Sequence, residues 1–369
     1  MVLNDIPATR AEIRAAAGQC IMCGLPGPSV ESEARELLRE SQALGVILFA
    51  RNVESPQQVA ELSAELKALR PEAPLLVSVD QEGGRVARIR APATEWPAPA
   101  QLGLLDDLAL TRRVAAALGS ELRAMNIDVT YAPVLDVNTN PNNPVIGDRA
   151  FGASVHAVAE HGKAFIAGLQ QASVGAVGKH FPGHGDTDVD SHFALPKVGH
   201  ELPLLREREW APFRESIKAG LDAVMTAHVL VEALDETRPA TLSRPVLRHL
   251  REELGFSGVI ISDDVEMKAL ADHFSVSQMA EGGINAGVDI FLACDRPEVT
   301  LELYASLVRA VESRRLTKRQ LFGAARRATA WRSRNCRAAQ MWGQTQHWVG
   351  HQSHQALSES ITTRLQKGV

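Results

Sequence analysis

The densest group of chemically capable residues is the segment 179–192, KHFPGHGDTDVDSH, which holds three histidines and three aspartates. Its glycines permit positive φ and Pro182 stiffens its start, so the segment can form a shaped loop. Asp190 and His192 are two residues apart, a spacing at which a carboxylate can hydrogen-bond an imidazole. A histidine with such a partner can donate a proton near neutral pH and later take one back. An isolated pair of this kind is usually a surface feature, but the surrounding residues favour a functional one.

A second motif is GFSGVIISDDVEM at residues 255–267, in which a short apolar run ends in Asp263 and Asp264. Adjacent side chains on a strand point in different directions. One carboxylate can therefore face a reaction centre as a nucleophile while the other caps the following helix. The motif alone does not decide which acid has which role.

A third motif is LLVSVDQEGGRVARIR at residues 75–90, where Asp80 ends an apolar run and Arg88 follows a Gly-Gly turn. A carboxylate and a guanidinium together suit a neutral polyol, because one accepts and the other donates hydrogen bonds to hydroxyl groups. A structural salt bridge is an equal alternative. A fourth motif, NPVIGDRAFG at residues 143–152, predicts by itself only a loop.

The elements that must position these motifs form a regular series. Eight short, β-rich apolar runs occupy residues 19–25, 45–50, 75–80, 129–137, 175–181, 223–229, 258–264 and 286–294. Segments with helical periodicity lie between and after them, such as residues 31–43, 56–69, 107–125, 154–172, 204–219, 244–254 and 299–312. Strand and helix therefore alternate along the chain.

Nearly continuous apolar strands separated by helices indicate a parallel sheet that is covered on both faces. Eight such units are the number that closes a (β/α)8 TIM barrel, which we predict as the fold. A doubly wound open sheet is the alternative, but the segment GLPGP lacks its Gly-rich phosphate turn. Several runs end in polar groups, at the face where barrel enzymes build their sites: Asp80, Asp136, His180, His228 and Asp263.

We expect one catalytic domain at residues 1–334 and a C-terminal extension at residues 335–369, which is rich in Gln, His, Ser and Trp. His347, His351 and His354 have the i, i+4, i+7 spacing of one helix face. That spacing could form a metal site, but a solvated tail is the more frequent explanation and is our prediction.

Composition narrows the partners and the compartment. The chain has 369 residues, 45% hydrophobic and 22% charged, with a formal net charge of -5. This balance gives no reason to expect nucleic acid or a membrane surface as a partner, and no run reaches the roughly 20 apolar residues of a membrane span. The four cysteines are too scattered for a disulfide framework, so we expect a cytoplasmic protein. Cys20 and Cys23 do not predict a CxxC site, because strand residues three apart face opposite sides.

Taken together, the four motifs resemble family 3 glycoside hydrolases, and within them the single-domain bacterial β-N-acetylhexosaminidases of peptidoglycan recycling. The resemblance covers roughly residues 20–332, and KHFPGHGDTDVDSH is its most specific element. VDQEGGRVARIR, IGDRAFG and GVIISDD support it. Residues 354–364, HQALSESITTR, are similar to the segment that opens the second domain of larger members, so the extension could be a remnant of that linker.

The resemblance implies a role for each matching residue. Asp263 is then the nucleophile, His192 the acid/base and Asp190 its partner. The terminal sugar, N-acetylglucosamine, is then held by five residues: Asp80, Arg88, Arg149, Lys179 and His180. The implied reaction removes this sugar with retention, through a covalent glycosyl-aspartate, from a small carbohydrate such as a muropeptide or a chitobiose-like compound. We expect a monomer without cofactor or metal.

Four alternatives stay open. A phosphorylase of the same family would transfer the covalent intermediate to phosphate instead of water, and a β-glucosidase would prefer another sugar. A sugar-binding protein without catalysis would keep the pocket alone. A metal-dependent barrel hydrolase would need a ligand set that the sequence can supply: His180, His184, Asp186, His192 and Asp263.

Overall fold

The strands form where short apolar runs are buried on both faces. The computed structural model describes residues 8–187 and 195–368. Every residue is buried in β1 (Ile21–Gly24), β2 (Gly45–Leu48), β3 (Leu76–Val79), β10 (Ala223–Thr226) and β14 (Ile290–Ala293). Burial on both faces explains why the runs are continuously apolar rather than alternating.

The parallel strands close into a barrel. The remaining ones are β6 (Val129–Thr130), β7 (Gly175–Ala176), β8 (Gly178–Phe181) and β13 (Val259–Asp264). The hydrogen-bonded order is β7-β6-β3-β2-β1-β14-β13-β10-β8. Because β7 and β8 are two parts of one run, separated only by Val177, the two ends of this order are the same strand of an eight-strand barrel. All eight predicted runs supply a strand, so the predicted (β/α)8 fold is confirmed.

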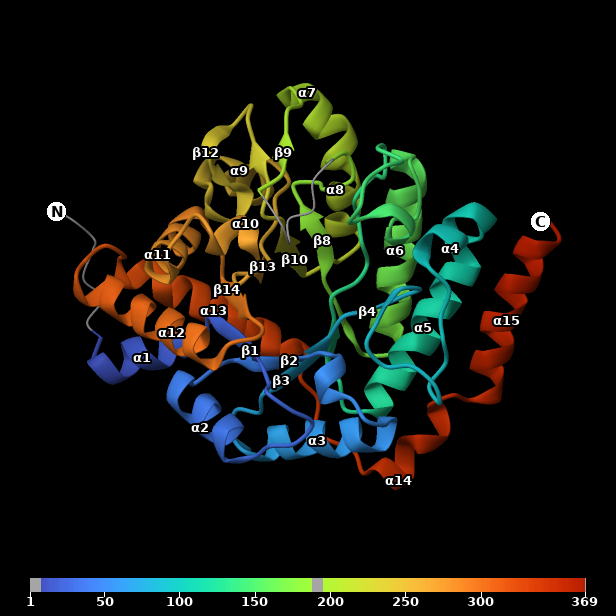
Figure 1. Ribbon diagram of the computed structural model, residues 1–369, viewed down its shortest axis with the longest axis horizontal. Helices are drawn as coiled ribbons and strands as arrows, with labels where there is room; N and C mark the ends of the chain where they lie inside the picture. Colours follow the sequence, from blue (N-terminus) through green and yellow to red (C-terminus); the bar gives the residue numbers. More distant parts are fainter. Residues whose placement is uncertain (1–7, 188–194, 369) are drawn as a thin grey trace.

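Helices surround the barrel strands (Figure 1). The seven predicted helical segments correspond to α2 (Ser32–Ser41), α3 (Pro56–Ala68), α5 (Leu108–Ala124), α6 (Val155–Gln171), α7 with α8 (Leu202–Leu204, Ala211–Lys218), α9 (Arg244–Arg248) and α12 (Pro297–Glu312). The structure adds helices that we did not predict: α1 (Arg10–Gly18), α4 (Pro99–Leu105), α10 (Lys268–Ala271), α11 (Val276–Ala286) and α13 (Lys318–Asn335). None of the helices in the described residues is long and apolar enough to cross a membrane.

The barrel interior is filled by its own apolar cluster. Met22, Ile47 and Tyr131 belong to it, and Trp331 of α13 joins it as a fully buried side chain. A second, larger cluster lies between the strands and the helices. Polar side chains lie at the carboxyl ends of the strands instead, as in other barrels of this class.

Two small sheets lie beyond those carboxyl ends. The hairpin β4 (Gln81–Gly83) and β5 (Val86–Ala87) follows β3 directly. β9 (Lys197–Val198), β11 (Leu230–Val231) and β12 (Asp235–Pro239) form the other sheet.

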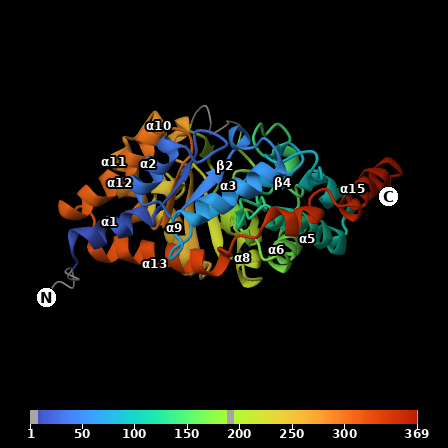
Figure 2. The same ribbon diagram turned by 90° about the horizontal axis from the view of Figure 1, so that it is seen from below.

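The C-terminal extension folds against the barrel helices. It contains α14 (Trp342–Thr345) and α15 (Gln352–Gln366), and α15 contacts α4 and α5. Figure 2, turned by 90° from Figure 1, shows α15 beside α5 at the edge of the molecule. His347 and His351 are exposed, but His354 is buried, so the prediction of a solvated tail is wrong for His354. The three histidines do not share one helix, because Gly350 has a positive φ of +63° between them.

Candidate active site

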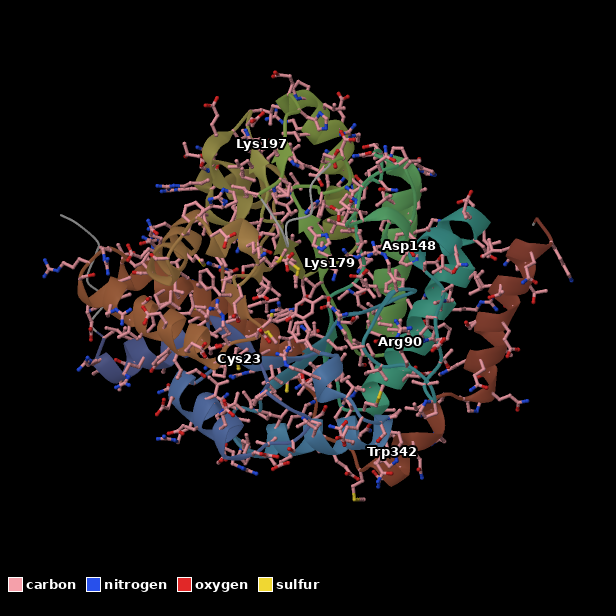
Figure 3. All side chains as sticks on the ribbon, viewed as in Figure 1. Cys23, Arg90, Asp148, Lys179, Lys197 and Trp342 are labelled. Carbon is pink, nitrogen blue, oxygen red and sulfur yellow. The ribbon has the colours of Figure 1, made fainter. Side chains whose placement is uncertain are left out.

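The candidate active site is a pocket of about 200 Å³ at the carboxyl ends of the strands. It is smaller than the roughly 300–1,000 Å³ of most ligand clefts, which suits one sugar ring rather than a chain. Five of its lining residues are ones that the sequence analysis selected: Asp80, Arg88, Arg149, His180 and Asp263. Arg85, Val86, Pro144, Val145 and His184 complete the lining. Figure 3 shows Lys179, which reaches Asp80, near the middle of the ring of elements.

The two adjacent acids of β13 lie in different environments. Burial by itself would raise the pKa of Asp263, but His180, His228 and the backbone N–H of Asp264 lower it below its ordinary value. Burial raises the pKa of Asp264 to about 7, and the neighbouring Glu266 and Asp263 add to this rise. Asp263, which lines the pocket, is therefore the ionised carboxylate of the pair at neutral pH.

Asp264 is engaged with the backbone instead. Its Oδ1 accepts hydrogen bonds from the N–H groups of Glu266, at 3.1 Å, and Cys294, at 3.3 Å. It thus closes the turn that leads from β13 into α10. One acid of the pair faces the pocket and the other terminates the strand, as adjacent residues on a strand end can do.

A buried ion network forms one wall of the pocket. Lys179 Nζ lies 2.8 Å from Asp80 Oδ1 and 2.6 Å from Glu82 Oε1. Arg149 donates to both oxygens of Glu82, at 2.9 and 2.8 Å. Burial by itself would raise the pKa of Glu82, but Arg149 and Lys179 lower it far below its ordinary value. Burial by itself would lower the pKa of Lys179, but Asp80 and Glu82 raise it above its ordinary value, so Lys179 stays charged.

Glu82 is a site residue that the sequence analysis missed. Glu82 belongs to β4 and lies two residues after Asp80, which directly precedes this strand. Both side chains therefore lie on the same side of the extended chain. That period of two was the signal that could have found it. Glu82 is 2% exposed, is not one of the residues that line the pocket, and pairs with Arg149 and Lys179, so it can hold these two cations in place.

A second buried carboxylate, Asp136, fixes the orientation of His180. Its Oδ2 lies 2.7 Å from His180 Nδ1. The same side chain accepts hydrogen bonds from the backbone N–H groups of His180, at 3.2 Å, and His184, at 2.8 Å. Since Nδ1 faces Asp136, the other ring nitrogen of His180 faces Arg149, 3.4 Å away, and the pocket. Asp136 was predicted at a strand end from the sequence, but without a role.

The rim of the pocket is basic. Arg88 Nη2 lies 3.4 Å from Asp80 Oδ2, and its guanidinium lies over the Phe49 ring at 5.6 Å from the ring centre. Arg88 Nε is buried without a hydrogen-bond partner among the described residues. Arg85 donates to Asp148, at 2.7 Å, and to the carbonyl of Val145, at 2.6 Å. Arg88 therefore has donor capacity left for a ligand.

Asp190 and His192 lie outside the described residues, so the pairing predicted for them stays a prediction. The chain is anchored before this segment, because Asn143 donates to the carbonyls of His184, at 2.8 Å, and Thr187, at 3.0 Å. Asp186 is also held there, since its Oδ2 lies 2.5 Å from His200 Nε2 and 3.0 Å from Arg208 Nη2.

The ligand set of the alternative metal-dependent hydrolase is not brought together in the part of the chain that the structure describes. Asp186 accepts a hydrogen bond from Thr139 and pairs with His200 and Arg208, and it is not among the residues that line the pocket. Burial and the charge of His180 lower the pKa of His184 to about 4. No group of three or more His, Cys, Asp or Glu side chains among residues 8–187 and 195–368 could hold a metal ion.

An ionised carboxylate in a small pocket at the carboxyl ends of a (β/α)8 barrel is an arrangement that suits a glycoside hydrolase. Comparison with known proteins gives the family. Residues 12–330 match the model of the glycosyl hydrolase family 3 N-terminal domain. The β-hexosaminidase of Nitrosomonas eutropha is 40% identical over 293 residues, which are 78% of this chain and 84% of that protein. The chain belongs to glycosyl hydrolase family 3, which confirms the family predicted from the motifs.

Two solved structures support the fold along nearly the whole chain. One is a family 3 β-N-acetylglucosaminidase from Paenibacillus sp. str. FPU-7, with a TM-score of 0.88 and 40% identity, covering 94% of this chain and 68% of that one. The other is NagZ from Neisseria gonorrhoeae in complex with N-trifluoroacetyl-D-glucosamine. Its TM-score is 0.78 at 32% identity, and the match covers 93% of this chain and 96% of that one.

Proposed function

We propose that the chain is a retaining exo-β-N-acetylglucosaminidase that removes a terminal β-linked N-acetylglucosamine through a covalent glycosyl-aspartate. The observation that carries the proposal is the ionised Asp263 in the wall of a pocket of about 200 Å³. A retaining glycosidase needs such a carboxylate on the anomeric carbon together with one group that moves a proton. The relatives named β-hexosaminidase and β-N-acetylglucosaminidase support the sugar.

In the first step, Asp263 attacks the anomeric carbon while His192 protonates the leaving oxygen, which departs as the free alcohol of the aglycone. In the second step, His192 takes a proton from water, and the water oxygen displaces Asp263 to release N-acetylglucosamine. Asp190 would hold the His192 ring. Two displacements at one carbon give retention of configuration.

The ion network holds the sugar during both steps. Asp80 accepts hydrogen bonds from ring hydroxyls, and Lys179, Arg149 and Arg88 donate to ring oxygens. These cations are already held by Asp80 and Glu82, so little rearrangement is needed when a neutral sugar enters. His180, oriented by Asp136, adds one further donor or acceptor at the pocket wall.

For the aglycone we propose an anionic muropeptide-type fragment in the cytoplasm. A histidine acid delivers its proton from a cationic or neutral group, whereas a carboxylic acid becomes anionic, so a histidine suits a leaving group that carries a carboxylate. The four cysteines are free thiols and support a reducing compartment. If His192→Glu kept full activity on an anionic substrate, this part of the proposal would be wrong.

The deciding experiment compares an aryl N-acetyl-β-glucosaminide with an aryl β-glucoside, using wild type and Asp263→Asn. We expect a strong preference for the N-acetylglucosaminide and almost no turnover by the variant. A preference for the glucoside would refute the sugar, and undiminished activity of the variant would refute the nucleophile. Product analysis with and without phosphate distinguishes hydrolysis from phosphorolysis, because phosphorolysis yields a sugar phosphate.

A further inference from the structure

The C-terminal segment 342–366 lies beyond the family match. It packs against the loop 88–97, which follows the β4–β5 hairpin. In α15, Ile361 is fully buried and His354 is 7% exposed. Arg364 of the same helix lies 3.0 Å from Asp107, the N-cap residue of α5. The segment is thus an ordered part of the barrel wall.

A buried carboxylate joins this segment to the loop. Glu121 of α5 is 3% exposed, and its Oε1 lies 2.9 Å from His354 Nδ1. The same carboxylate accepts two hydrogen bonds from Thr94, at 2.9 Å from the backbone N–H and 2.5 Å from the hydroxyl. The His354 ring also lies against Trp96, with 6.0 Å between ring centres. His354 and the loop therefore share one buried polar anchor, the carboxylate of Glu121.

Two further contacts join the C-terminal segment to the backbone of the loop 88–97. Ser358 donates to the carbonyl of Glu95, at 2.7 Å. Gly350 packs so closely on the loop that a Cβ at this position would lie 2.1 Å from the carbonyl oxygen of Pro92. The loop is thus held at three points. Gly350 lies against Pro92, His354 is joined to Thr94 through Glu121, and Ser358 donates to Glu95.

The loop in turn supports the hairpin that lines the sugar pocket. Gly84 donates its N–H to the carbonyl of Trp96, at 2.9 Å. A Cβ at Gly83 would lie 2.4 Å from the carbonyl oxygen of Pro97, so the hairpin turn rests directly on the loop. On the other side, the Gln81 side chain accepts the N–H of Arg88, at 2.9 Å, and so ties the first residue of the loop to β4. A displacement of the loop must therefore move the hairpin.

We propose that segment 342–366 is a positioning element of the active site: it clamps the loop 88–97 and thereby holds Arg88 against the sugar. The inference rests on the proposed function, in which Arg88 binds the ring. Because Arg88 binds the sugar before and during the reaction alike, loosening the clamp weakens substrate binding and leaves the chemical step intact.

The test uses a pair of glycine substitutions in the full chain. Gly350→Ala drives a methyl group into Pro92, whereas Gly368→Ala adds the same strain at a φ of +71° with nothing within 4 Å. We expect Gly350→Ala to raise KM for the aryl glycoside about tenfold, within the hundredfold cost of a misplacement of roughly 1 Å, with kcat nearly unchanged. Gly368→Ala should keep the wild-type KM.

Ser358→Ala and His354→Gln test the clamp without a clash, and they carry the test if Gly350→Ala does not fold. Ser358→Ala should raise KM about threefold, and His354→Gln less than His354→Ala because the amide can still donate to Glu121. A variant that melts earlier but keeps the wild-type KM would overturn the proposal, since the segment would then only stabilise the barrel. Each variant is compared with wild type on the aryl glycoside that wild type cleaves best. A wrong sugar assignment therefore shows in wild type alone and is separate from failure of the clamp.

Discussion

Replacing Glu82 with glutamine removes the charge that holds two buried cations and changes little in shape. Glu82 receives one hydrogen bond from Lys179 and two from Arg149, at 2.6–2.9 Å, and it is 2% exposed. In the variant, the amide NH₂ must face an N–H donor of Arg149 or Lys179, so at least one of these contacts is lost. Lys179 then keeps its ion pair with Asp80, whereas Arg149 loses its ion pair with Glu82.

The expected cost follows from burial. Breaking a buried charge pair by removing one partner costs about 3–5 kcal/mol. For 369 residues, an unfolding entropy of roughly 2.1 cal/mol/K per residue converts that loss into a fall in Tm of about 4–6 °C. We also expect kcat/KM to fall about tenfold or more, because Arg149 and Lys179 lose their fixed positions.

Glu252→Gln is the matched control. Glu252 pairs with Arg248 at 2.7 Å in an i, i+4 pair whose side chains are 66% and 68% exposed. Exposed pairs of this kind contribute about 0–1 kcal/mol, so the control should lower Tm by about 1 °C or less. Thermal unfolding followed by circular dichroism measures both variants. If Glu82→Gln lowered Tm no more than Glu252→Gln does, the reasoning about the buried network would be refuted.

The pH dependence of this effect has a definite sign. The pKa of Glu82 is lowered in the folded chain from its ordinary value of 4.5, despite burial, by Arg149 and Lys179. A depressed carboxyl pKa stabilises the fold fully above the unfolded pKa and is lost as the pH falls towards the folded pKa. The difference in stability between wild type and Glu82→Gln should therefore be constant above about pH 5 and shrink below pH 4.5.

Three further predictions follow from the pocket. Asp263→Asn should lower kcat at least about 10³-fold with a much smaller change in the affinity for N-acetylglucosamine, measured by calorimetry; a parallel loss of both would indicate a binding role. Asp264 has a pKa raised to about 7 by burial, so wild type loses stability as the pH rises from 3.8 to 7. Asp264→Asn should therefore gain stability over wild type at pH 8 relative to pH 5, and an equal difference at both values would contradict the assignment. Activity should survive exhaustive chelation, whereas a loss that zinc restores would revive the metal-dependent alternative.

The strands could be predicted from the sequence because burial on both faces leaves an unambiguous apolar run. Some helices could not, since their buried faces carry few large apolar residues. In α13 the buried positions are Leu321, Ala324, Ala325, Ala328 and Trp331, which follow helical spacing but are mostly alanine among arginines. In α15 only His354 and Ile361 are buried, seven residues apart. The amphipathic signal is too weak in both helices.

Prediction of the site depended on how local each interaction is. Asp263 was selected from two acids by resemblance, and the physical reason is visible only once His180 and His228 surround it. Asp136 is 44 residues from His180 in sequence, so their contact depends on the neighbouring strands of the closed barrel. Glu82, by contrast, could have been predicted from the sequence, because it lies two residues after Asp80 and so shares the same face of the extended chain.

The basic groups around the pocket explain how the buried carboxylate of Asp263 can stay ionised. Asp80, Glu82, Asp136 and Asp263 face Lys179, Arg149, Arg88 and the imidazole of His180. Burial by itself would raise the pKa of Asp263 and protonate the proposed nucleophile, but His180, His228, the backbone N–H of Asp264 and Lys179 lower its pKa below the ordinary value. A low pKa also makes the same carboxylate a better leaving group when water displaces it. In the proposed mechanism these groups therefore favour both displacements at the anomeric carbon, and a neutral sugar can enter without adding an unbalanced charge.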